Sequence, residues 1–321
     1  MGKVFITDYI SDPYIERSML KEHITDDIND KEIEVLLVWH QEITKDYLNK
    51  FPNLKGVVRY GVGYDAIDLD AIKEAKLIFC NNPDYGVTEV SETALSMLLA
   101  WSRGILEYDF LAKGLPPTWQ ENTIPRLRRS SEIQVGVIGA GRIGSRFLKN
   151  AEAIGFQTAY YDPYVKQSSL SALKAKKFSS LEMLLSSCDA ISVHTPLDDS
   201  TKGLVDSKFL AQMKLGSCLI NTARGGLINS LDDLLVAIDT GRLSGAYLDV
   251  LPEEPPIAGS FIDAWTSAEC PNLGGRIIVN PHTAYFTQDS YIEMRTKATQ
   301  NALNILSGLS PNYVICDGRN L

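Results

Sequence analysis

The sequence predicts an α/β protein with two doubly wound parallel sheets, and two observations lead to that prediction. Short aliphatic or β-branched runs alternate with longer polar stretches of helical periodicity along almost the whole chain. Such alternation is typical of parallel strands whose crossover helices cover both faces of a sheet. The chain has 321 residues, which is long enough for two domains with separate cores.

The first series of expected strands covers residues 3–7, 34–39, 56–60 and 77–81, with helical patterns between them. A longer amphipathic helix is expected at residues 89–105, where apolar side chains recur at helical spacing. Gly114-Leu115-Pro116-Pro117 then interrupts the pattern. We expect this helix and the loop after it to bridge two domains.

The second series begins at Gln134, with expected strands at residues 134–138, 158–161, 190–193, 217–221, 244–248 and 276–280. Strands and helices in this number fit a complete doubly wound nucleotide-binding domain. One more helix pattern, residues 291–307, is too short to form a domain and should pack back on the first one. The predicted domains are therefore residues 1–100 with 285–321, and residues 101–284.

Composition excludes several classes of protein. The formal net charge of −9 opposes nucleic-acid binding, which needs a basic surface. The short basic cluster Arg126-Leu127-Arg128-Arg129 is interpreted as a solvated loop. No apolar stretch reaches the length of a membrane span, and the first residues enter a strand pattern instead of a signal peptide. A cytoplasmic protein with no membrane partner is expected.

The cysteines are five in number, widely spread, and include no Cys-x-x-Cys pair. This pattern argues against a disulfide framework and against a zinc site. We expect buried, reduced thiols and no bound metal. The cysteines are Cys80, Cys188, Cys218, Cys270 and Cys316.

The clearest local motif is Gly139-Ala140-Gly141-Arg142-Ile143-Gly144, which follows an apolar strand and opens a helix. In this pattern the first glycine makes a tight turn, the second lets the backbone approach a pyrophosphate, and the third allows close strand–helix packing. The helix N-terminus at Arg142 and Ile143 then offers amide groups and a positive dipole end to the phosphates. The motif predicts a Rossmann domain that binds a dinucleotide.

An acidic residue, Asp162, ends the next expected strand, 18 residues beyond Gly144. A carboxylate here hydrogen-bonds the adenosine ribose and repels a 2′-phosphate, which favours NAD over NADP. The alternative is an aspartate that caps the turn at Pro163. The context favours the contact with the cofactor.

Seven motifs in order resemble the D-isomer-specific 2-hydroxyacid dehydrogenase family over nearly the whole chain. The N-terminal segment and residues 59–68 are most similar to the C-terminal-binding-protein branch. The segment that begins at His282 is more similar to the D-lactate dehydrogenase branch. The resemblance implies a Rossmann NAD-binding domain inserted in a flavodoxin-like substrate domain. The motifs are the glycine motif and residues 59–65, 161–163, 194–196 with Thr201, 221–226, 249–255 and 280–285.

Position by position, Arg224, Glu254 and His282 match the catalytic residues of the family. An arginine forms charged hydrogen bonds to a carboxylate, and a histidine can exchange a proton with the substrate oxygen as hydride is transferred. The glutamate favours the protonated imidazole by its opposite charge. The family spacing after Asp249 selects Glu254 instead of Glu253. His23 and His40 lie outside the motifs and are interpreted as structural or surface residues.

The resemblance also implies the other contacts of the site. The backbone of Val62 and Gly63 should bind the substrate carboxylate, and Asp249 should hold the nicotinamide carboxamide. Tyr285 either touches the substrate side chain or only packs, and His194 either touches the cofactor or caps a strand end. Further cofactor contacts are expected at Thr195, Pro196, Thr201, Thr222 and Ala223.

The predicted activity is hydride transfer between NAD(H) and a small 2-oxo acid or its (R)-2-hydroxy acid. Family members are commonly homodimers, with the helix at residues 89–105 in the interface, and we expect the same here. An NADH-sensing corepressor with little turnover is the alternative that the C-terminal-binding-protein likeness suggests. A formate dehydrogenase is disfavoured, because that branch carries glutamine where this chain has Glu254.

Overall fold

The computed structural model describes residues 2–8, 10–267 and 273–320. It forms two compact units, one of Met1–Gly86 with Phe286–Leu321 and one of Val87–Tyr285. Each unit contains one mainly parallel sheet with interleaved helices, so the predicted α/β class with two doubly wound sheets is confirmed. The domain limits expected from the sequence, at residues 100/101 and 284/285, stay a prediction. In the structure the chain passes from one unit to the other at residues 86/87 and 285/286.

The sheet of the first unit has the strand order β13-β5-β4-β3-β1-β2. Its strands run parallel except for β13, which is antiparallel to β5. Without β13 this is the 2-1-3-4-5 order of flavodoxin-like folds, as predicted. The strands are β1 (Lys3–Ile6), β2 (Ile24–Thr25), β3 (Ile33–Val38), β4 (Gly56–Arg59), β5 (Ile78–Cys80) and β13 (Val314–Asp317).

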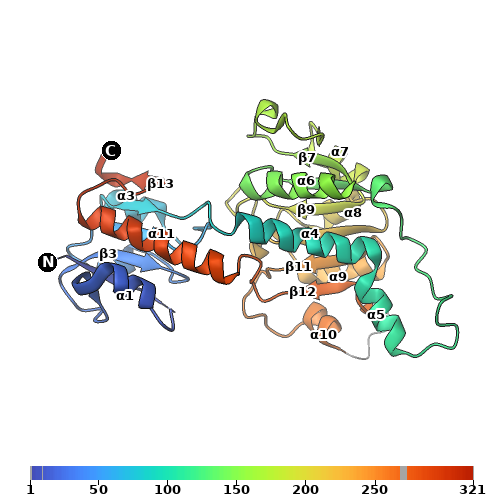
Figure 1. Cartoon of the computed structure of the whole chain (residues 1–321), viewed down its shortest axis with the longest axis horizontal. Coiled ribbons are helices and arrows are strands. Elements are labelled where there is room, and N and C mark those ends of the chain that lie inside the picture. The colour runs from blue at the N-terminus through green and yellow to red at the C-terminus, as the bar shows by residue number, and fades with distance from the viewer. Residues whose placement is uncertain (1, 9, 268–272, 321) are drawn as a thin grey trace. The chain divides into compact units, whose positions relative to one another are not determined.

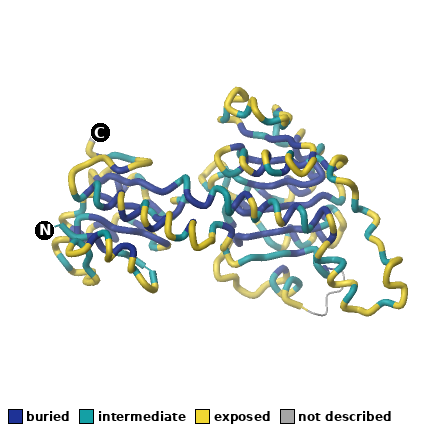
Figure 2. The backbone as a smooth tube through the Cα atoms, in the orientation of Figure 1, coloured by how far each residue is buried: buried dark blue, intermediate teal, exposed yellow. Residues whose placement is uncertain are grey.

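The helices of the first unit are α1 (Tyr14–Leu20), α2 (Lys45–Leu48), α3 (Leu69–Glu74) and α11 (Gln288–Leu306). The helix α11 begins with a capping box formed by Thr287 and Ser290. It packs on α1, β3 and β4 (Figure 1), as expected for the last helical pattern. Burial of the central strands, dark blue in Figure 2, forms the core of this unit.

The sheet of the second unit has the order β12-β11-β10-β9-β6-β7-β8, and all its neighbours are parallel. Counted from β6, the order contains the 3-2-1-4-5-6 arrangement of a Rossmann domain, extended by β12. The strands are β6 (Gln134–Ile138), β7 (Gln157–Tyr161), β8 (Lys176–Lys177), β9 (Ala190–Val193), β10 (Ser217–Asn221), β11 (Leu243–Leu248) and β12 (Ile277–Val279).

The helices α4 and α6 pack against each other over this sheet (Figure 1). The predicted helix at residues 89–105 is α4, but it begins earlier and ends at Arg103. Gly104 has φ +60°, a left-handed conformation suited to glycine, and α5 starts after it. The helices are α4 (Val87–Arg103), α5 (Ile105–Lys113), α6 (Arg142–Ile154), α7 (Leu181–Ser187), α8 (Ser207–Gln212), α9 (Leu231–Asp239) and α10 (Ser260–Thr266).

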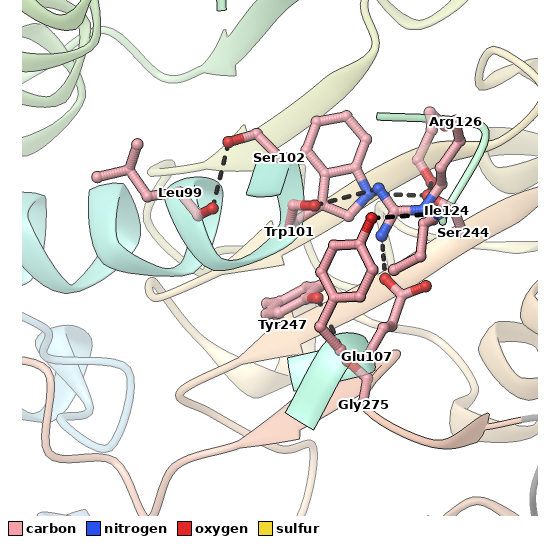
Figure 3. A network of polar contacts seen from close by, with 11 residues as sticks. Leu99, Trp101, Ser102, Glu107, Ile124, Arg126, Ser244, Tyr247 and Gly275 are labelled. Carbon is pink, nitrogen blue, oxygen red and sulfur yellow. Dashed lines mark hydrogen bonds and ion pairs between the residues drawn. The ribbon is translucent and has the colours of Figure 1, made fainter. Parts of the chain in front are cut away.

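A polar network holds α5 and the loop after it on the second unit (Figure 3). The Arg126 guanidinium pairs with Glu107, donates to the carbonyl of Trp101 and lies over the indole ring. The indole Nε1 of Trp101 donates to Ser244 Oγ at 2.8 Å. Arg128 pairs with Asp189 at 2.5 Å. Arg128 and Arg129 are exposed, in line with the interpretation of this basic cluster as a solvated loop, whereas the Arg126 side chain is only 22% exposed and pairs with Glu107.

Four cysteines lie within the described residues, all as free thiols. Cys80, Cys188 and Cys218 are buried free thiols and Cys316 is half-buried, whereas Cys270 lies outside the described residues. Burial raises the pKa of Cys80 and of Cys188 to about 12, so both thiols are inert at neutral pH. Within the described ranges, no helix combines the length and apolarity needed to cross a membrane.

Candidate active site

The predicted site residues of the second unit follow the carboxyl ends of its strands. The glycine motif comes after β6, Asp162 after β7, and His194 after β9. Arg224 follows β10, Glu254 follows β11 and His282 follows β12. Because all these strands are parallel, their carboxyl ends share one edge of the sheet, where open α/β sheets bind ligands.

The glycine loop is built for close approach. Gly139 has φ +87°, and a Cβ there would lie 2.8 Å from the amide nitrogen of Thr195. A Cβ on Gly144 would run into the carbonyl oxygen of Gly139. A Cβ on Gly141 would meet nothing within 4 Å, so the space beside this residue is open to a ligand. Gly141 is the N-cap of α6 and provides no side-chain cap to the helix.

The Asp162 carboxylate is nearly buried and accepts three backbone hydrogen bonds. Its Oδ1 receives the amides of Tyr164 and Val165 at 2.8 and 2.9 Å, which is the turn-capping role weighed from the sequence. Its Oδ2 receives the amide of Ala140 at 2.8 Å and so fastens the glycine loop to β7. The contact with a ribose stays a prediction.

The loop after β9 contains a neutral histidine. Burial lowers the pKa of His194 to about 3. Its Nε2 shares a hydrogen bond of 2.8 Å with Ser192 Oγ, and its Nδ1 has no partner within the described chain. Further along, the hydroxyl of Thr201 donates to the carbonyl of Pro196 at 2.7 Å and receives the Asp198 amide. Thr201 therefore shapes this loop, and Thr195 and Pro196 lie within it.

The loop after β10 is oriented by Asn221, a residue whose role the sequence analysis missed. Its side chain receives the amide of Ala223 at 3.0 Å and donates to the carbonyl of Arg224 at 2.9 Å. Gly225 follows, and a Cβ there would run into the carbonyl oxygen of Leu251. The buried Thr222 hydroxyl has no partner among the described residues. An asparagine at the end of a buried strand was the available signal.

His282 and Glu254 form a hydrogen-bonded pair. His282 Nδ1 lies 2.7 Å from Glu254 Oε2, and Glu254 Oε1 receives the amide of Leu251 at 2.8 Å. Burial raises the pKa of Glu254, but the hydrogen bond and charge of His282, the Leu251 amide and the charge of Arg224 outweigh it, so this pKa lies below its ordinary value. Glu254 is therefore a carboxylate at neutral pH, and it leaves Nε2 of His282 for another partner.

Asp249 forms hydrogen bonds to the backbone of His282 and of the two residues after it. Its buried carboxylate accepts hydrogen bonds from the backbone amides of Thr283 at 3.1 Å and Ala284 at 3.0 Å. Its backbone carbonyl accepts a hydrogen bond from the amide of His282 at 2.8 Å. Burial raises the pKa of Asp249, and these amides oppose the effect. His282 has φ +54°, unusual for a residue with a Cβ. The three amide bonds hold that conformation, a positioning role that the sequence did not reveal.

In the first unit, Val62 and Gly63 lie in the loop after β4. His23 Nδ1 donates a hydrogen bond of 2.9 Å to the Gly2 carbonyl, and His40 lies at the surface beside Asp8, in line with structural or surface roles. Tyr285 is half-buried at the end of the second unit. The structure therefore places one group of predicted residues on each unit.

The residues of the second unit fit a dinucleotide. The backbone is open beside Gly141, and two buried polar atoms in neighbouring loops, Thr222 Oγ1 and His194 Nδ1, lack partners among the described residues. Buried polar atoms without partners are rare in native proteins and indicate an absent ligand or water. Three adjacent βα loops thus offer a cradle for phosphates and polar groups.

Comparisons with known proteins agree with this geometry. Residues 95–284 match the model of "D-isomer specific 2-hydroxyacid dehydrogenase, NAD binding domain". The chain is 31% identical to the D-3-phosphoglycerate dehydrogenase of Bacillus subtilis (strain 168), an alignment that covers 96% of this chain and 58% of that protein. It is 30% identical to C-terminal-binding protein 1 of Caenorhabditis elegans, with 89% and 40% covered. The chain thus spans about half the length of these curated relatives.

Among solved structures, the fold is similar to a D-lactate dehydrogenase of Aquifex aeolicus complexed with NAD and lactic acid. The TM-score is 0.82 at 28% identity, and 96% of each chain is covered. From the matching family model, the sequence relatives and the fold, this chain belongs to the D-isomer-specific 2-hydroxyacid dehydrogenase family, and its second unit is the NAD-binding domain of that family.

Proposed function

We propose that this chain is an NAD-dependent dehydrogenase that interconverts a small 2-oxo acid and its (R)-2-hydroxy acid. The observation that carries the proposal is the 2.7 Å bond between His282 Nδ1 and Glu254 Oε2 at the carboxyl edge of the NAD-binding sheet. Arg224 lies close enough for its charge to lower the pKa of Glu254. A carboxylate-binding cation and a proton donor are the groups that reduction of an oxo acid requires.

The nicotinamide cofactor supplies the hydride when bound. Arg224 binds the substrate carboxylate by charged hydrogen bonds, together with the backbone amides of Val62 and Gly63. His282 gives a proton from Nε2 to the substrate oxygen in reduction and takes it back in oxidation, since Nδ1 is held by Glu254. Tyr285 contacts the side chain of the substrate.

The cofactor contacts divide among the strand-end loops. Gly139, Gly141, Gly144 and the first amides of α6, at Arg142 and Ile143, hold the pyrophosphate. Asp162 hydrogen-bonds the adenosine ribose, and Asp249 holds the nicotinamide carboxamide. The remaining contacts come from the loops after β9, β10 and β12, at His194, Thr195, Pro196, Thr201, Thr222, Ala223 and His282.

We also propose that the chain forms a homodimer through the helix predicted for the interface, which is α4, together with α5 and the loop after it. Large apolar side chains are exposed there, with Ile105 at 55%, Leu115 at 78% and Trp119 at 58%. Apolar side chains gathered on one segment favour an interface with another protein surface. The network around Arg126 fixes this segment on its own unit before any partner binds.

A panel of 2-oxo acids, assayed by loss of NADH absorbance, tests the activity. Glyoxylate, pyruvate, phenylpyruvate, 2-oxoisocaproate and hydroxypyruvate sample small, apolar, aromatic and polar side chains. At least one should be reduced, and His282→Ala should lose most of that rate while it still binds NADH. Rates equal in the variant and the unaltered chain would remove His282 from the mechanism.

The alternative function is an NADH-sensing corepressor with little turnover, which the similarity to C-terminal-binding protein 1 favours. Protein partners captured only in the presence of NADH, together with no reduction of any acid in the panel, would support it. The arrangement of Arg224, Glu254 and His282 favours the enzyme.

A further inference from the structure

The loop after β4 has its carbonyl groups held by two neighbouring asparagines. Asn81 and Asn82 follow β5, the strand beside β4, so that their side chains reach the adjacent strand end. Asn81 Nδ2 donates to the carbonyl of Val62 at 2.6 Å. Asn82 Nδ2 donates to the carbonyl of Tyr60 at 3.0 Å, and its backbone amide donates to that of Gly61 at 3.4 Å.

Asn82 also connects this loop to α11. Its Nδ2 lies 3.3 Å from the carbonyl of Met294, and its Oδ1 lies 3.5 Å from Nδ2 of Asn301. Asn301 is itself fixed by the backbone amide of Asn312 at 2.8 Å. Asn82 and Asn301 are each 1% exposed, so water does not replace these bonds readily. The loop is thus connected to α11 by hydrogen bonds of the buried side-chain amides of Asn82 and Asn301.

The amide groups of the same loop are used differently. Within the described ranges, the amides of Gly61, Val62 and Gly63 donate to no protein atom, although the carbonyls of Gly61 and Val62 accept bonds. Successive backbone amides without protein partners are available to bind an anion. The carbonyls of Gly61 and Val62 accept hydrogen bonds from the two asparagines, and the backbone amides of the loop are left to bind a ligand.

We propose that Asn82, with Asn81, is a positioning residue that sets the Val62 and Gly63 amides for the substrate carboxylate. The inference rests on the proposed function, in which these amides bind an oxo-acid carboxylate. Neither asparagine acts on the reacting atoms; each acts through the loop carbonyl that it holds. Loss of a donor leaves a buried carbonyl without its partner, and the loop is expected to rotate or loosen.

A role in fold stability alone is the competing explanation, and binding of a carboxylate probe separates the two. The probe is oxamate, an unreactive oxo-acid analogue, titrated into the full chain saturated with NADH and followed by calorimetry. Asn82→Ala and Asn81→Ala should each weaken oxamate binding by roughly tenfold or more, since a lost hydrogen bond in a buried site has effects of that order. NADH affinity, which belongs to the other unit, should stay within about twofold.

Two further variants complete the design. Asn82→Ser retains one donor and should give an oxamate affinity between those of Asn82→Ala and the unaltered chain. Thr299→Val removes a buried hydroxyl that donates to the carbonyl of Arg295, a hydrogen bond within α11 that does not involve the loop. It should lower thermal stability without a change in oxamate affinity. If Asn82→Ala does not fold, Asn82→Ser and Asn81→Ala carry the test.

The outcomes distinguish the inference from the function on which it rests. If the unaltered chain binds oxamate, and Asn81→Ala and both Asn82 variants bind it with the same affinity, only the positioning role is overturned. Absence of oxamate binding by the unaltered chain, with no reduction of any oxo acid, overturns the proposed function and this inference together. Weakened binding in Thr299→Val equal to that in Asn82→Ala assigns the effect to general destabilisation and also overturns the inference.

Discussion

Replacement of Glu254 by glutamine removes one negative charge from the proton-transfer pair and keeps the shape of the side chain. Glu254 Oε2 lies 2.7 Å from His282 Nδ1, and the two side chains are 37% and 40% exposed. Glu254 has a lowered pKa, so its charge is present throughout the neutral range. The carboxylate favours the protonated imidazole, the form that reduction requires.

The size of the effect follows from this geometry. Because both side chains are more than a third exposed, the dielectric constant of water is the appropriate one. At 2.7 Å it gives an attraction of about 1.5 kcal/mol between the two unit charges. The glutamine amide group, if turned toward Nδ1, further disfavours the protonated ring because both groups would then present hydrogens.

The alkaline limb of kcat/KM for oxo-acid reduction should therefore move toward acid in Glu254→Gln, because the attraction that favours the protonated ring is lost. The limb for hydroxy-acid oxidation, which needs the neutral ring, should move in the same direction and widen activity downward. The parameter kcat/KM is compared because slow product release can hide the shift in kcat. Glu253→Gln is the matched control. An unmoved limb in Glu254→Gln, or an equal shift in Glu253→Gln, would refute the assignment.

Three other predictions address separate parts of the account. Arg224→Ala should lower kcat/KM for oxo acids by roughly a hundredfold with little change in NADH affinity, since a charged hydrogen-bond pair to the substrate is lost; near-normal steady-state turnover would exclude it from carboxylate binding. The ratio of kcat/KM for NADH to that for NADPH should be at least about ten because Asp162 repels a 2′-phosphate, and similar values would show that another residue reads the ribose. Asp189→Asn should reduce the free energy of unfolding by about 1–3 kcal/mol in urea titrations, because the buried carboxylate binds Lys214, the Gln134 amide and Arg128. Burial raises the pKa of Asp189, but these partners outweigh it and lower the pKa overall. The stability that Asp189 contributes is therefore present above the carboxyl pKa of the unfolded chain and is lost as pH falls below about 4. An equal pH dependence of unfolding in Asp189→Asn would contradict this.

The sequence could predict those parts of the fold in which local pattern and burial agree. Strand–helix alternation identified the central strands, and the glycine motif placed the turn at Gly139 and the open backbone at Gly141. The order of residues along the chain placed Arg224, Glu254 and His282 after the three successive strands β10, β11 and β12. These inferences depend on near neighbours in sequence and on the parallel geometry of one sheet.

The parts that were missed depend on contacts distant in sequence. The strands β2 and β8 have two residues each, too few to show a period, and β13 is an edge strand recognised only by its pairing with β5. A single glycine inside a helical pattern does not reveal that Gly104 adopts a left-handed conformation and divides α4 from α5. Asn221, Asp249 and Asn82 form hydrogen bonds to backbone groups, which any sequence provides equally, so these contacts leave no pattern in the sequence.

Transfer of deuterium from NADH to the substrate tests the central claim most directly. NADH carrying deuterium at C4 is incubated with the chain and the most rapidly consumed 2-oxo acid of the panel, and the product is analysed by mass and by chiral chromatography. The account predicts deuterium at C2 of the (R)-2-hydroxy acid, with almost none formed by His282→Ala. A product of (S) configuration, or oxidation of NADH without deuterium at C2, would contradict it.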